Sequence, residues 1–155
     1  MEFPDLSALE NNKQSISFNV EEIDFVFEEI DKTILWLNSV AEQESKNIVS
    51  LDYVFCSDEY LHKINVRYLN HDTYTDIITF DFGVPGDDLI SGEIYISIDR
   101  VKENAQIHNS AYTDELLRVI VHGLLHLMGY PDKSEEEALL MRGKEERALN
   151  TYKRL

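Results

Sequence analysis

The sequence has little positive charge and only one cysteine. Its 155 residues include 14 lysines and arginines against 30 aspartates and glutamates, so the formal net charge is −16 at pH 7. Broad nucleic-acid binding usually depends on a basic surface, and such a role here would need a local basic cleft, a bound cation or a carrier protein. The single Cys56 cannot form an internal disulfide, so nothing favours an oxidising compartment.

The sequence also has no long apolar run, and its first residues do not resemble a secretory signal. No uninterrupted apolar stretch approaches the roughly 18 residues that a membrane span needs. The first residues, MEFPDLSALENN, lack the basic start and apolar centre of a secretory signal. We therefore expect a cytoplasmic protein with no membrane partner. The length and a hydrophobic content of 43% are typical of one globular domain, which we take to span 1–155.

The periodicity of apolar residues predicts a mixture of helices and strands. Helices and strands do not alternate regularly, which favours an α+β fold in a single compact domain, with about four strands in a mixed sheet packed with helices. We expect Ser57, Thr113 and Ser134 to cap helices, the last in a capping box with Glu137. The expected strands cover about 16–20, 47–56, 76–82 and 92–98, and the expected helices about 21–43, 58–68, 99–109, 113–128 and 135–150.

The stretch VHGLLHLMGYPD (121–132) places two histidines four residues apart near the end of the long central helix. His122 and His126 would lie on one helical face, where both can reach one metal ion. Gly129 can turn the chain back, which would bring Asp132 towards the pair. Two imidazoles and one carboxylate would leave a fourth position for water, as in catalytic zinc sites. The alternative is a pair of ordinary helix histidines followed by a plain turn.

The residue after the first histidine limits the chemistry. A zinc protease of the common type carries a glutamate there as general base, whereas this chain has Gly123. Protease chemistry by that route is therefore disfavoured. A metal ion could still lower the pKa of its bound water to about 7 and activate it without a neighbouring base.

Residues 122–132, HGLLHLMGYPD, resemble the signature of the YbeY endoribonuclease family, whose usual form is H-G-x-L-H-L-x-G-Y-D-H. A second segment, INVRYLNHDTYTDIITF (64–80), is similar to another motif of that family. The strand GEIYIS (92–97) and an acidic helix after the signature follow in the expected order, so the resemblance covers the chain from about residue 47 onwards. The signature positions that match are His122, Gly123, Leu125, His126, Leu127, Gly129 and Tyr130.

The resemblance implies a compact α+β domain with one metal ion per chain, zinc or another divalent ion, held by three side chains. It implies a single-strand-specific endoribonuclease that acts in rRNA maturation, notably at the 3′ end of 16S rRNA, and in ribosome quality control. The implied partners are single-stranded rRNA and the small ribosomal subunit with its proteins, in the cytoplasm.

Two positions depart from the family pattern. The third ligand of the family is a histidine, and Asp132 stands there; a carboxylate is a competent zinc ligand but favours harder ions such as manganese or magnesium. The family usually has an arginine where this chain has Leu69, and the nearby Arg67 and His71 are candidates to replace it. The expected metal ligands are His122, His126 and Asp132, the catalytic residues His122, His126 and Arg67, and the substrate-binding residues Arg67, His71 and Arg118.

Some alternatives stay open on the sequence. Arg118, one helical turn before His122, could contact a phosphate or instead form a salt bridge with Asp114 or Glu115. The whole chain could be a metal-dependent hydrolase of another substrate, such as peptide, which digestion of RNA and casein would distinguish. It could also be a non-catalytic ribosome-associated module whose metal serves stability alone.

Overall fold

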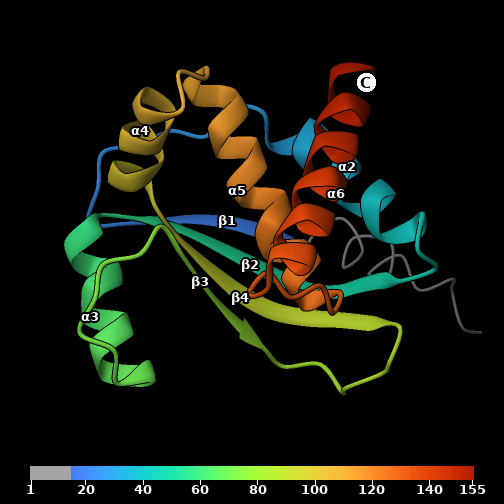
Figure 1. Cartoon of the computed structure of the whole chain (residues 1–155), viewed down its shortest axis with the longest axis horizontal. Coiled ribbons are helices and arrows are strands. Elements are labelled where there is room, and N and C mark those ends of the chain that lie inside the picture. Colours follow the sequence, from blue (N-terminus) through green and yellow to red (C-terminus); the bar gives the residue numbers. More distant parts are fainter. Residues whose placement is uncertain (1–14) are drawn as a thin grey trace, which may run out of the picture.

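Four strands form one mixed sheet in the order β1-β2-β4-β3 (Figure 1). The computed structural model describes residues 15–155. Neighbouring strands are parallel except for β3, which pairs antiparallel with β4, so the mixed sheet and the α+β class are confirmed. The strands are β1 (Ile16–Glu21), β2 (Asn47–Cys56), β3 (Ile77–Asp81) and β4 (Leu89–Ser97).

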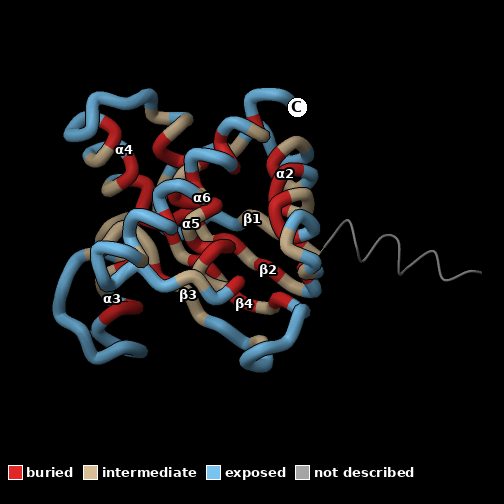
Figure 2. The backbone as a smooth tube through the Cα atoms, turned by 45° about the vertical axis from the view of Figure 1, so that its right-hand side comes forward, coloured by how far each residue is buried: buried red, intermediate tan, exposed pale blue. Residues whose placement is uncertain are grey.

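Helices cover both faces of the sheet (Figure 1). Tyr53 and Ile94 of the inner strands belong to the main core with α2, α5 and α6, whereas Val54 and Tyr95 pack in a smaller cluster with α3. Figure 2 shows how the buried residues concentrate between the sheet and the central helix α5. The helices are α2 (Ile30–Glu42), α3 (Asp58–Leu69), α4 (Ile98–Ile107), α5 (Tyr112–Leu127) and α6 (Glu135–Lys153).

The central helix α5 is fixed closely on the sheet. A Cβ atom added at Gly123 would lie 2.8 Å from Cδ1 of Ile94, so only glycine allows this approach of helix to strand. The buried hydroxyl of Tyr53 on β2 donates a hydrogen bond of 2.7 Å to the carbonyl of Ile120. These contacts hold the end of α5, and with it the histidine pair, in one place against the sheet.

The predicted helix over 21–43 is wrong for residues 21–29, because α2 begins only at Ile30. Residues 22–29 form neither helix nor strand: Ile23, Phe25 and Phe27 alternate with exposed neighbours and pack on the core, while Val26 is 76% exposed. Their spacing fits a period of 2 at least as well as a helical period, and aromatic contacts such as that of Phe27 with the core decide the outcome.

Most predicted helix caps are confirmed. The Ser57 hydroxyl accepts a hydrogen bond from the Tyr60 amide, and Ser134 with Glu137 forms a complete capping box. The expected cap at Thr113 is wrong, since α5 begins one residue earlier, at Tyr112, after an N-cap residue that has no side-chain hydrogen bond. No helix in the described part of the chain has the length and apolar character to cross a membrane.

Cys56 is a core residue at the end of β2. It is fully buried, and burial, assisted by nearby carboxylates such as Asp58, raises the pKa of its thiol to about 12. The thiol therefore stays protonated at neutral pH, which excludes it as a nucleophile there.

Candidate metal centre

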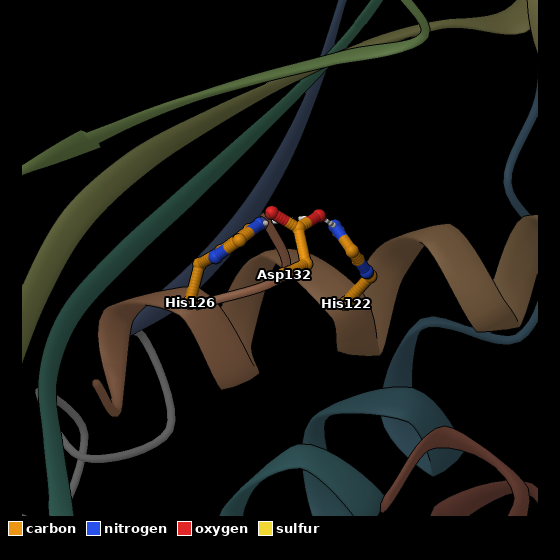
Figure 3. Close-up of side chains that lie close together, drawn as sticks. All are labelled: His122, His126 and Asp132. Carbon is orange, nitrogen blue, oxygen red and sulfur yellow. Dashed lines mark ion pairs between the residues drawn. The ribbon is translucent and has the colours of Figure 1, made fainter. Parts of the chain in front are cut away.

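His122, His126 and Asp132 converge at the C-terminal end of α5 (Figure 3). A carboxylate oxygen of Asp132 lies 3.4 Å from Nε2 of each histidine, and one potential ligand atom from each residue lies within 4.8 Å of the others. The three side chains are 20%, 26% and 38% exposed, in sequence order, so the cluster is accessible from solvent. The structure thus brings together the three residues that the sequence predicts as ligands.

The other ring nitrogen of each histidine is held by a hydrogen-bond acceptor. Nδ1 of His122 lies 2.6 Å from a carboxylate oxygen of Glu145, and Nδ1 of His126 lies 2.9 Å from the carbonyl oxygen of Tyr130. An acceptor at Nδ1 keeps the proton on that atom in the neutral ring, which leaves the lone pair on Nε2. Both lone pairs are therefore available on the side where Asp132 lies.

The turn after α5 has the form that its sequence predicts. Gly129 has φ +101°, a left-handed conformation that favours glycine, and the amide of Tyr130 donates to the carbonyl of Leu125 at 3.1 Å. The Tyr130 hydroxyl donates to the carboxylate of Glu44 in the turn after α2. Anchored in this way, the turn returns the chain so that Asp132 faces the histidine pair.

The charges around His122 favour its protonated form when no metal is present. Burial by itself lowers the pKa of the imidazole, but the hydrogen bond to Glu145 and the charges of Glu145, Asp132 and Asp76 together raise it above its ordinary value. Such a concentration of carboxylates around imidazoles also attracts a cation. Two imidazole nitrogens and one carboxylate oxygen, already close together, fit a divalent ion such as zinc with a further position open to substrate or solvent.

Arg118 contacts the residues that surround the metal centre and not the three ligands themselves. Its guanidinium contacts Glu145 at 3.1 Å and also hydrogen-bonds Glu146, both on α6. The partners expected from sequence, Asp114 and Glu115, are therefore not the ones it has, since a neighbouring helix supplies better-placed carboxylates. Through Glu145, Arg118 is connected to His122 and not directly to the ligand atoms.

Arg67 and His71 lie away from the three ligands. Arg67 is on α3, which packs on the face of the sheet opposite α5 (Figure 1), and His71 is in the loop after α3. Both residues are exposed. The guanidinium of Arg67 lies 5.6 Å from the ring centroid of Tyr68. Their catalytic and substrate-binding roles stay predictions. In this structure neither Arg67 nor His71 contacts the histidine pair.

Comparison with known proteins decides the family. The endoribonuclease YbeY family matches residues 8–153. The chain belongs to the endoribonuclease YbeY family. One relative, the endoribonuclease YbeY of Flavobacterium johnsoniae, is 48% identical over 137 residues, which cover 88% of this chain and 96% of that protein. The endoribonuclease YbeY of Flavobacterium psychrophilum is 50% identical over 137 residues, with the same coverage of both chains.

A solved structure supports the fold of this YbeY family member. The solution structure of TM1509 from Thermotoga maritima superimposes with a TM-score of 0.66 at 24% identity, covering 88% of both chains. At that identity the likeness concerns the fold alone.

Sequence reasoning missed Glu145, which lies 23 residues beyond its histidine partner. A signal was present: Met141, Ala148 and Leu149 form the buried stripe of α6, and Glu145 lies on this stripe, only 6% exposed. An acidic residue at a core-facing helix position needs a partner, because an unpaired buried carboxylate is costly. The carbonyl of Tyr130, which holds His126, could not be predicted in this way, because every residue has a backbone carbonyl.

Proposed function

We propose that this protein is a metal-dependent, single-strand-specific endoribonuclease that acts in rRNA maturation, at the 3′ end of 16S rRNA, and in ribosome quality control. Family membership supports the activity. The observation that carries the proposal is the convergence of His122, His126 and Asp132 with both Nε2 atoms directed to one point. We propose one zinc ion per chain as cofactor, and the small ribosomal subunit with its proteins as the cytoplasmic setting.

The residues of the chain have distinct tasks in this proposal. A divalent ion held by His122, His126 and Asp132 would supply Lewis-acid chemistry to a phosphodiester and offset its negative charge. Glu145 and the carbonyl of Tyr130 keep the two rings oriented. At Gly123 a side chain would meet the sheet and not the ligands, so no glutamate base of the protease type can operate from this position.

The shape of the site favours an unpaired strand. Two of the ligands, His122 and Asp132, border a cavity between α4, α5 and α6 instead of lying on a flat surface. A single strand can bend one phosphodiester into such a cavity, whereas a stiff duplex must be deformed at an energetic cost. An RNA strand that also crosses the edge of the sheet at β3 could place another phosphate near Arg67 and His71, which we propose as secondary substrate contacts.

The proposal is tested by cleavage of a fluorescent single-stranded RNA oligonucleotide. We expect His126→Ala to lower the rate at least about 100-fold, since it removes one of three ligands. His62→Ala, which changes a histidine on α3, serves as the matched control and should cleave at the wild-type rate. Equal cleavage by wild type and His126→Ala would overturn the proposal.

Two further outcomes would replace the proposal with its alternatives. Digestion of casein but not RNA would indicate a peptide hydrolase. A zinc-dependent rise in melting temperature with no activity on either substrate would indicate a binding module in which the metal serves stability.

A further inference from the structure

The cavity beside the ligands extends beyond them. It has a volume of about 360 Å³, and its lining includes His122 and Asp132 together with Asn104 and His108 at the end of α4 and Arg142 on α6. Small-molecule sites usually have volumes of about 300–1,000 Å³, so this one has room for about one nucleotide.

Most carboxylates in the cavity already have a cationic or ring partner. Glu145 contacts Arg118 and His122, and Glu115 lies 3.9 Å from a ring nitrogen of His108. Asp132 faces both histidines of the metal centre. These acids are therefore less able to repel a phosphate than their number suggests.

Arg142 is the cation in the cavity that remains free for a ligand. It is exposed, and within residues 15–155 it forms no ion pair shorter than 4 Å. The pKa of the nearby Glu146 is lowered chiefly by its hydrogen bond from Arg118, and only to a lesser degree by the charge of Arg142. The forked guanidinium of an unpaired arginine is well suited to bind a phosphate.

Apolar side chains complete the wall. Val119 and Ala138 border the cavity, and so does Leu139, whose side chain is 72% exposed although it is large and apolar. A free guanidinium next to an apolar wall matches a nucleotide, which combines an anionic phosphate with the apolar face of its base.

We propose that this cavity binds the nucleotide next to the scissile bond and that Arg142 contacts its phosphate. The proposal rests on the proposed endoribonuclease function and adds a substrate-binding site to it. Because Arg142 lies outside the ligand set, its loss should weaken the binding of RNA and leave both the metal and the chemical step unchanged.

The test compares Arg142→Gln with Arg147→Gln in the zinc-loaded protein. Arg147 is exposed on the same helix but borders a different cavity, with Val40 of α2 and Gln43 just after it. The two substitutions change the net charge equally. We expect Arg142→Gln to raise KM for single-stranded RNA about tenfold, with kcat within about twofold of wild type. A plot of the logarithm of the RNA binding constant against the logarithm of the salt concentration has a negative slope. We expect this slope to become less steep by about 0.7 in Arg142→Gln, as for one lost phosphate contact.

The outcomes separate this proposal from the proposed function. Equal effects of the two substitutions, or a loss of bound zinc in Arg142→Gln, would overturn the role of Arg142. If the wild type binds RNA without cutting it, the proposed function fails, and the salt slope alone decides for or against Arg142. If the wild type neither binds nor cuts RNA, both proposals fail.

Discussion

Glu145 is the residue through which the surrounding protein controls the geometry of the metal centre. Its carboxylate holds Nδ1 of His122 at 2.6 Å and is itself held by Arg118 at 3.1 Å. This arrangement resembles the carboxylate–histidine pairs that orient ligands in zinc proteins. Since Glu145 is buried and does not touch the position between the ligands, it is a positioning residue.

We therefore predict that Glu145→Ala weakens zinc binding by about 10- to 100-fold, and that Glu145→Gln, which keeps an oxygen acceptor, weakens it less. The measurement is competition for zinc with a chromophoric chelator. Glu146→Gln is the matched control, because it removes the same charge from the adjacent, more exposed position. Equal zinc affinities in wild type and Glu145→Ala would contradict the positioning role.

At the scale of single residues, the sequence predicts the metal ligands better than the residues that orient them. The spacing of His122 and His126 on one helix, and a short turn to Asp132, are local features that follow from helix geometry. The contact of His122 with Glu145 depends on how α5 and α6 pack, as do the true partners of Arg118. Such contacts join residues distant in sequence, and no periodicity specifies them.

At the scale of elements, the close contact between α5 and β4 positions the histidine pair. Gly123 lies where any side chain would meet Ile94, which is fully buried and cannot move aside easily. Local patterns predict this helix well, since its apolar face and the glycine after it are continuous in sequence. They fail before α2, where the spacing of Ile23 and Phe27 suits a period of 2 as well as a helix, and tertiary packing selects a non-helical chain.

This packing predicts opposite effects for two glycine substitutions. Gly123→Ala should lower the free energy of unfolding by about 1–3 kcal/mol, because the added methyl overpacks the contact with Ile94. Gly143→Ala, at an exposed position in α6 with open space around it, should raise that free energy by about 0.5–1 kcal/mol. Urea denaturation of the zinc-loaded proteins measures both. A Gly123→Ala variant as stable as Gly143→Ala would show that the helix does not approach the strand this closely.

At the scale of the whole molecule, the sequence predicts the α+β class and about four strands but not their order. The placement of β4 between β2 and β3 depends on how the long connections cross the sheet, which strand propensity does not determine. The formal charge of −16 is likewise a property of the whole chain, and it opposes RNA at long range. A cation concentrated at one end of α5 is therefore central to the proposed activity.

The most direct test of that claim is X-ray diffraction at the zinc absorption edge from crystals of the zinc-loaded protein. We predict an anomalous peak about 2.0–2.2 Å from Nε2 of His122, Nε2 of His126 and a carboxylate oxygen of Asp132. A map with no peak between these three atoms, or with zinc bound only elsewhere on the chain, would contradict it.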